Sequence, residues 1–271
     1  MSITDELLST LLQDSSKIFE RINAVPAFLS ESHIASLKQQ QLLHSENAFK
    51  NFFKRWPRVY ETCVWLVGPS FFTGMTPAKF IRTFIHDGIV LHAGSGTRIL
   101  QGHCLNIDLF PFPGVDVLAD LEALPFKDGA FAGVTCDQVL EHVSRPTLVA
   151  AELQRVVRSG GLIHVASPFV FPWHPSPLDY TRWTMEGLCA MFPQCSVIKK
   201  GVMAGPCSAL TALLAAFFAT ACSFGCRRLQ SILQYLFLIL FMPIKFFDLV
   251  LAHIPGAELC AANIYVVVRK Q

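Results

Sequence analysis

Short apolar runs alternate with turns and an amphipathic stretch through the middle of the chain, and this alternation predicts an α/β domain. Five strands are expected, at residues 89–91, 104–107, 115–118, 132–136 and 162–166. A helix is expected at residues 147–158, between the fourth and fifth strands. Such alternation is typical of a parallel, doubly wound sheet. Two further apolar runs, at residues 196–203 and 264–269, complete a mostly parallel seven-stranded sheet.

The first 60 residues show helical periodicity instead. Apolar residues recur there at helical spacing: Leu7, Leu8, Leu11, Leu12, Ile18, Phe19 and Ile22. Pro26 interrupts this run, and a second helix is expected over residues 30–55, before Trp56 and Pro57. No pattern here points to chemistry. Residues 1–85 are therefore predicted to form an N-terminal helical cap that covers the sheet or closes a pocket.

A strongly apolar insertion precedes the last predicted strand. Residues 206–252 carry only four charged side chains: Arg227, Arg228, Lys245 and Asp248. Two helices are expected, at residues 208–224 and 229–252, and each approaches the roughly 20 apolar residues of a membrane span. Because the last strand must rejoin the sheet, the insertion leaves and returns on one side. This favours a hairpin that enters one leaflet or lies at a membrane surface; the alternatives are a homodimer interface, helices that cover the core, and a true span.

Composition narrows the function classes. The chain is 52% apolar and 15% charged, with a mean hydropathy of +0.43, and its net charge of +2 includes no basic cluster that suggests nucleic acid. The nine cysteines form no CxxC pair, and no histidine cluster has zinc-ligand spacing, so reduced thiols and no metal are expected. Asp5 and Glu6 stand where a basic leader would be, so no secretory signal is expected. A cytoplasmic, membrane-associated protein is the predicted location.

A glycine-rich turn follows the first predicted strand and carries the first sign of chemistry. Gly94 and Gly96 allow the backbone to approach a ligand closely. The backbone N–H groups of such a turn can then bind a carboxylate or phosphate of the ligand. Asp108 ends the second strand, where a carboxylate accepts hydrogen bonds from ribose hydroxyls. The arrangement predicts a nucleotide site at one edge of the sheet.

Four segments extend this pattern: residues 117–126 (VLADLEALPF), 127–131 (KDGAF), 137–143 (DQVLEHV) and 152–161 (ELQRVVRSGG). In this order they resemble the type 11 family of class I S-adenosylmethionine-dependent methyltransferases. The resemblance implies a Rossmann-like domain over residues 86–204, which residues 259–271 complete beyond an insertion at 205–258. It implies S-adenosylmethionine as cofactor, with Asp120 and Leu121 at the adenine and Asp137 beside the sulfonium.

The chain departs from this family at two positions of the glycine-rich turn. His92 stands where the family usually has an acidic residue that contacts the amino group of the cofactor, and Arg98 stands at the third glycine. So few residues separate Arg98 from the second strand that the helix usual at this point is expected to shrink to a turn. A degenerate, non-catalytic scaffold is therefore the alternative to an enzyme. A nicotinamide-dependent Rossmann enzyme is a weaker third reading, because Ile99 interrupts its fingerprint.

A further stretch indicates the acceptor side. Residues 167–169 and 174–184 resemble methyltransferases of cell-envelope sugar and lipid pathways, and they follow the fifth strand, at the edge where ligands bind. His174, Asp179, Tyr180 and Arg182 are therefore expected to face the acceptor. His142 and His174 are the candidate bases; the alternatives are structural roles, in support of the pocket for His142 and within the proline-containing loop for His174. The predicted function is methyl transfer to a small-molecule or lipid-linked acceptor at a membrane surface.

Overall fold

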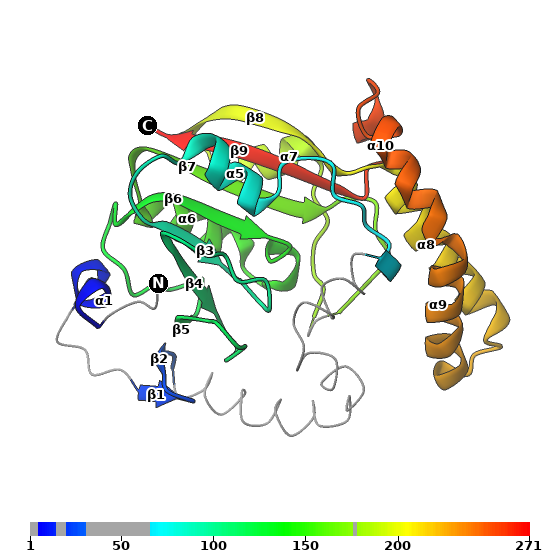
Figure 1. The fold of residues 1–271 in the computed structure, drawn as a ribbon, viewed down its shortest axis with the longest axis horizontal. Helices are drawn as coiled ribbons and strands as arrows, with labels where there is room; N and C mark the ends of the chain where they lie inside the picture. Colours follow the sequence, from blue (N-terminus) through cyan, green and yellow to red (C-terminus); the bar gives the residue numbers. More distant parts are fainter. Residues whose placement is uncertain (1–4, 15–19, 31–65, 176–177) are drawn as a thin grey trace.

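The computed structural model describes residues 5–14, 20–30, 66–175 and 178–271, and it contains the predicted sheet (Figure 1). The sheet has nine strands in the order β1-β2-β5-β4-β3-β6-β7-β9-β8, two more than predicted. Their bounds are β1 Glu20–Ile22, β2 Val25–Phe28, β3 Val90–Ala93, β4 Cys104–Asp108, β5 Val117–Ala119, β6 Phe131–Asp137, β7 Val157–Pro168, β8 Cys195–Ala204 and β9 Asn263–Lys270. The Rossmann-like, mostly parallel α/β fold is confirmed.

Strand order explains where a ligand binds. Strands β5, β4, β3, β6 and β7 are parallel neighbours, whereas β9 runs antiparallel between β7 and β8. From β3 the chain proceeds outward to β4 and β5, then returns to β6 on the other side of β3. Ligands of open α/β sheets bind at the carboxyl ends of the strands beside such a reversal. Apart from His92, which lies within β3, the polar residues of the predicted site lie at or after one of these strand ends.

Helices cover both faces of the sheet. The helices α1 (Asp5–Leu11), α6 (Pro146–Val156) and α7 (Met185–Ala190) share one apolar core with the parallel strands. The opposite face is covered by α5 (Pro77–Phe84), whose Phe80 is fully buried. Two layers of helix around a buried sheet explain why the parallel strands are mostly apolar.

The N-terminal region differs from its prediction. The structure confirms a helix at α1, but Ile22 lies in strand β1 and Pro26 in strand β2, which form a hairpin rather than a helix. Asn23 and Ala24 both have positive φ, the backbone of a tight two-residue turn. Strand β2 then pairs in parallel with β5, so pairing at the sheet edge overrides the helical pattern. Ile18, Phe19 and the helix predicted at residues 30–55 lie outside the described residues, apart from Ser30.

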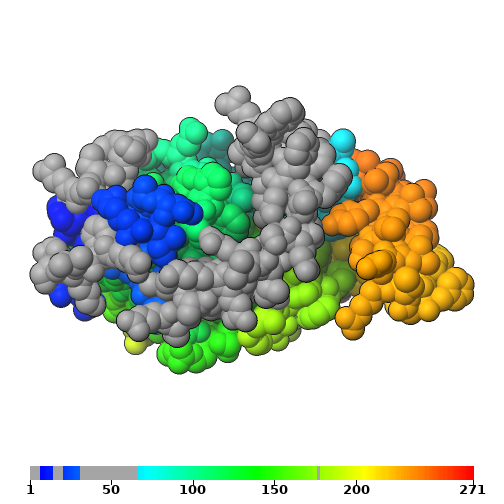
Figure 2. Space-filling view, turned by 90° about the horizontal axis from the view of Figure 1, so that it is seen from below, coloured from blue at the N-terminus to red at the C-terminus, as the bar shows by residue number. Residues whose placement is uncertain are grey.

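The apolar insertion forms a helical hairpin. It comprises α8 (Pro206–Cys222), α9 (Arg227–Phe241), the 3-10 segment η2 (Met242–Phe247), α10 (Asp248–Leu251) and the 3-10 turn η3 (Ala257–Cys260). Figures 1 and 2 show α8 and α9 side by side at one end of the molecule, beyond the sheet. The Ala262 N–H donates to the Gly205 carbonyl over 3.2 Å, so the insertion begins and ends at one place, as predicted.

Helices α8 and α9 pack on each other, but much of the apolar surface of the hairpin is exposed within the described chain. Helix α9 has no buried residue, so it does not cover the core. The helical run Arg227–Leu251 has the length and composition of a membrane span, and α8 is a shorter apolar helix. Large apolar side chains are exposed along both: Leu210, Leu213, Phe217, Phe224, Ile232, Leu236, Ile239, Leu240, Phe247, Leu249 and Val250.

The four charged side chains of residues 206–252 are divided between the two ends of the hairpin. Arg227 and Arg228 are exposed at the bend, whereas Lys245 and Asp248 are fully buried at the base. Asp248 accepts hydrogen bonds from the backbone N–H groups of Cys207 and Ser208 and thereby caps α8. Lys245 donates to two backbone carbonyls that precede the domain, those of Leu66 and Gly68. These buried contacts attach the hairpin to the sheet domain.

Asp248→Ala tests this attachment. It removes the cap of α8 and leaves two buried N–H groups without an acceptor, so the free energy of unfolding is expected to fall by about 2 kcal/mol. Thermal unfolding in detergent, followed by circular dichroism, measures the effect. Glu258→Ala, which removes an exposed carboxylate from the same insertion, is the control and should change the midpoint little. Equal midpoints for both variants would contradict the capping role.

Candidate active site

The glycine-rich turn at the end of β3 meets the end of β4. The Gly96 N–H donates to Asp108 over 2.8 Å, and the Phe110 N–H donates to the same carboxylate over 2.9 Å. Gly94 has a φ of +69°, and a Cβ added there would lie 2.4 Å from a methyl carbon of Val139. Only glycine fits that position without strain. Burial raises the pKa of Asp108, while these N–H groups favour its ionised form.

Arg98 closes the turn in place of a helix. The described residues 94–103 contain no helix, as the short spacing predicts. The Arg98 guanidinium lies 3.4 Å from Oδ2 of Asp137 and 5.4 Å from the ring centre of Phe72. Asp137 ends β6, and its burial raises its pKa to about 6, an effect that Arg98 opposes. A cation therefore already lies at the carboxylate that the family resemblance places beside the sulfonium.

His92 belongs to a buried polar row across the sheet. Its Nδ1 lies 3.0 Å from Oδ1 of Asn106, and burial lowers its pKa to about 4, so the ring is neutral. Next to it, Thr135 bonds to His164, whose other ring nitrogen lies 2.9 Å from the Met75 carbonyl. The one side-chain hydrogen bond of His92 within the described chain ties the sheet together. A contact of His92 with the cofactor, at the position where the family has its acidic residue, stays a prediction.

Asp120 and Leu121 follow β5 at the same edge. The Glu122 N–H donates to Asp120 over 2.9 Å, and Leu121 is nearly buried in the main core. Three buried polar atoms near these strand ends have no hydrogen-bond partner among the described residues: Ser95 Oγ, Asp137 Oδ1 and Gln138 Nε2. Buried polar groups are normally paired. These orphan atoms, with a cation at Asp137, fit a ligand that carries hydroxyls and a positive charge.

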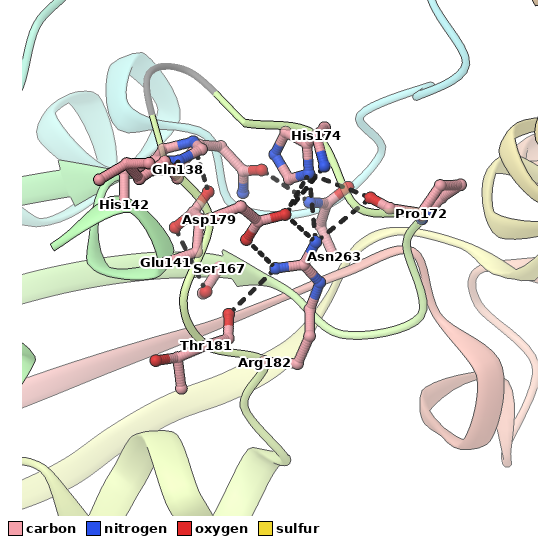
Figure 3. A network of polar contacts seen from close by, with 11 residues as sticks. Gln138, Glu141, His142, Ser167, Pro172, His174, Asp179, Thr181, Arg182 and Asn263 are labelled. Carbon is pink, nitrogen blue, oxygen red and sulfur yellow. Dashed lines mark hydrogen bonds and ion pairs between the residues drawn. The ribbon is translucent and has the colours of Figure 1, made fainter. Parts of the chain in front are cut away.

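The residues predicted for the acceptor side lie together beyond the end of β7 (Figure 3). Asp179 and Arg182 form a two-pronged ion pair, with N–O distances of 2.5 and 2.6 Å, and Arg182 lowers the pKa of Asp179 to about 2. Asp179 also accepts a hydrogen bond from the backbone N–H of His174. The ring of His174 lies 5.2 Å from that of His142. Tyr180 joins the loop through its backbone, which donates to the Glu141 carbonyl.

Glu141 is a member of this cluster that the sequence analysis missed. It lies in the 3-10 turn η1 (Leu140–His142), fully buried, and its Oε1 is 3.8 Å from Nε2 of His142. Burial raises its pKa to about 8. Its place immediately before the candidate base His142 was the available signal. Gln138, Ser167 and Asn263 also line the cluster, and nothing in the sequence pattern marks them.

Comparison with known proteins agrees with this geometry. Residues 103–165 match the family model described as a methyltransferase domain, of type 11. The chain is 38% identical over 81 residues to a demethylmenaquinone methyltransferase of Renibacterium salmoninarum, a match that covers 29% of this chain and 34% of that protein. The chain thus spans about a third of the length of this relative.

Solved methyltransferase structures also resemble the chain. One is a methyltransferase of Thermotoga maritima, with 13% identity and a TM-score of 0.45, covering 82% of this chain and 99% of that one. Another is phosphoethanolamine N-methyltransferase 2 of Haemonchus contortus, with 13% identity and a TM-score of 0.46, covering 82% and 60%. The family match rests on the segment from β4 to β7, which contains Asp108, Asp120 and Asp137. Over residues 103–165 the chain is therefore similar to the type 11 domain of the class I S-adenosylmethionine-dependent methyltransferases.

Proposed function

We propose that the protein transfers a methyl group from S-adenosylmethionine to a small-molecule or lipid-linked acceptor at a membrane surface. The observation that carries the proposal is the meeting, at one sheet edge, of the glycine-rich turn, the buried Asp137 and the histidine cluster. When bound, the cofactor supplies a methyl group on a sulfonium. That group is already electrophilic, so orientation of the acceptor supplies much of the rate.

The cofactor side uses residues of three strand ends. Asp108 holds the ribose hydroxyls with the lone pairs that its two backbone donors leave free. Asp120 and Leu121 hold the adenine. Asp137 attracts the positive sulfonium, as it now attracts the guanidinium of Arg98. Arg98 must yield this carboxylate when the cofactor binds, and its long, half-exposed side chain permits that movement.

The acceptor side uses the loop after β7. Nδ1 of His142 lies 2.5 Å from the Leu178 carbonyl and donates to it, so Nε2 keeps its lone pair for an acceptor hydroxyl or amine. Asp179 and Arg182 are positioning residues, because they satisfy each other and hold His174. A quinone acceptor would suit both the apolar hairpin and the name of the relative, a demethylmenaquinone methyltransferase.

The exposed hairpin provides the membrane contact. Lipid is the occupant that suits it, because contiguous apolar surface of this extent is rarely left in water. A hairpin that starts and ends at one place returns β9 to the sheet without carrying the domain across a bilayer. Arg227 and Arg228 lie at the bend, where long side chains reach lipid headgroups. A degenerate scaffold is the second candidate, and the Arg98–Asp137 ion pair in the cofactor position is the observation that favours it.

Calorimetric titration with S-adenosylhomocysteine tests the cofactor site. Asp108→Ala is expected to weaken binding by about 1–3 kcal/mol, because ribose hydroxyls lose their acceptor. Asp87→Ala removes an exposed carboxylate before β3, at the opposite edge of the sheet, and should bind like the wild type. No heat from the wild type at millimolar ligand would overturn the enzyme proposal in favour of the scaffold.

Asp137 makes the affinity for the charged cofactor depend on pH. Its pKa of about 6 means that the carboxyl is protonated at pH 5 and ionised at pH 7. S-adenosylmethionine should therefore bind up to about tenfold tighter per pH unit as the pH rises from 5 to 6, and level off above that. S-adenosylhomocysteine, which lacks the positive sulfur, should show no such trend. Asp137→Asn should abolish the difference between the two ligands; an unchanged pH profile in that variant would exclude Asp137 as the cause.

Liposome sedimentation tests the membrane contact. The wild type should sediment with vesicles and resist a high-salt wash, because apolar burial is not screened as charge is. Leu236→Glu with Leu240→Glu, both exposed on one face of α9, should lower the partition at least tenfold. Leu148→Glu, at an exposed position of α6, is the matched control.

A second variant separates the hairpin from the domain. Because Gly205 and Ala262 are hydrogen-bonded neighbours, a short Gly/Ser loop in place of residues 206–256 should leave β8 and β9 joined. That variant should be soluble and should still bind S-adenosylhomocysteine. An intact protein that is a soluble monomer without detergent would refute the membrane proposal, whereas a soluble dimer would assign the hairpin to a homodimer interface.

A further inference from the structure

Three ligating side chains converge at the acceptor side. Glu141, His142 and His174 each present a ligand atom, and all three atoms lie within 4.8 Å of one another. His142 and His174 are far apart in sequence, so spacing alone predicted no metal site. The loop after β7 brings them together, because the Tyr180 N–H donates to the Glu141 carbonyl over 2.7 Å and His142 donates to Leu178. Figure 3 shows the cluster.

Glu141 supplies an unsatisfied oxygen to this cluster. Its Oε1 is buried and has no hydrogen-bond partner in the described part of the chain, while Oε2 has Ser167 at 3.5 Å. A buried carboxylate oxygen without a donor is costly. Two ligand atoms of one tetrahedral cation, each about 2.1 Å from the metal, lie about 3.4 Å from each other. The 3.8 Å between Oε1 and Nε2 of His142 needs only a small side-chain rotation to reach that value.

Both imidazoles are held so that Nε2 keeps its lone pair. Nδ1 of His142 donates to a carbonyl. Nδ1 of His174 faces the Pro172 carbonyl at 3.2 Å, Asp179 at 3.4 Å and Nη2 of Arg182 at 3.2 Å. The two hydrogens of that Nη2 already go to Pro172 and Asp179, so Nδ1 of His174 is left to donate. A carboxylate behind a histidine is the usual support of a metal-ligating imidazole.

We propose that Glu141, His142 and His174 bind one divalent transition-metal cation. Two imidazoles and one carboxylate suit Zn²⁺, Mn²⁺, Fe²⁺ or Co²⁺ better than Ca²⁺ or Mg²⁺, which prefer oxygen ligands. Three protein ligands leave a coordination position open, as in catalytic sites, and an oxygen of the acceptor takes it. Nε2 of His142 is then a ligand of the cation, so its role as a base applies to the cation-free site. Cation binding stands on these residues alone, whereas its part in methyl transfer rests on the proposed function.

Cobalt titration of the full-length, chelator-treated protein in detergent tests the proposal. Co²⁺ bound by nitrogen and oxygen gives visible absorption without the near-ultraviolet charge-transfer band of thiolate ligation, which separates this site from the cysteines. Calorimetry should show one strong site. Glu141→Gln and His174→Ala should each weaken it at least tenfold, whereas His103→Ala, an exposed histidine between β3 and β4, should leave it unchanged.

Binding of S-adenosylhomocysteine to each variant serves as the control for folding. Variants that keep this binding and lose cobalt confirm the cation site. Wild-type protein that binds S-adenosylhomocysteine but no cobalt, or cobalt binding that persists in both variants, overturns the cation site and leaves the proposed function standing. Cobalt bound at the three residues without any cofactor binding confirms the site and overturns methyl transfer.

Discussion

The position of strand β9 between β7 and β8 is the constraint on which the rest of the structure depends. It completes the sheet with a strand that follows the apolar insertion in sequence, so the hairpin must leave and return at one point. The first residue of that strand also reaches the site. Nδ2 of Asn263 donates to Oε1 of Gln138 over 2.8 Å, and Gln138 has a positive φ immediately after Asp137. The same strand end thus anchors the hairpin and supports the backbone beside the buried carboxylate.

Electrostatics divides the carboxylates of the site into two kinds. Asp179 is matched by Arg182 and a backbone N–H, which lower its pKa, and it holds the loop after β7 in place. Asp137 and Glu141 are buried with one oxygen each unpaired among the described residues, and their burial raises their pKa values. Carboxylates with shifted pKa values are common at functional sites, because a bound ligand supplies the partner that the protein does not provide. Here they lie where a cation, either sulfonium or metal, would be stabilised.

The charged residues of the hairpin also fall into two groups, one buried and one exposed. Its two buried charges have backbone partners at the base, and its two arginines lie exposed at the bend, so the helices between them are left almost purely apolar. Within the described chain α9 packs against α8 but has no buried residue. The hydrophobic effect therefore favours covering the exposed face of the hairpin, which the described part of the sheet domain leaves open.

The sequence by itself determined the elements whose pattern is local. The parallel strands, the helix after β6, the two apolar helices and the carboxylates at strand ends follow from periodicity and from residues adjacent in sequence. Only the tertiary structure decided the rest. Pairing with β5 turned residues around Pro26 into strand β2, since a sheet edge supplies hydrogen bonds that a short helix cannot. Burial of Asp248 and Lys245 and the meeting of Glu141 with His174 depend on contacts between distant segments, which no local pattern encodes.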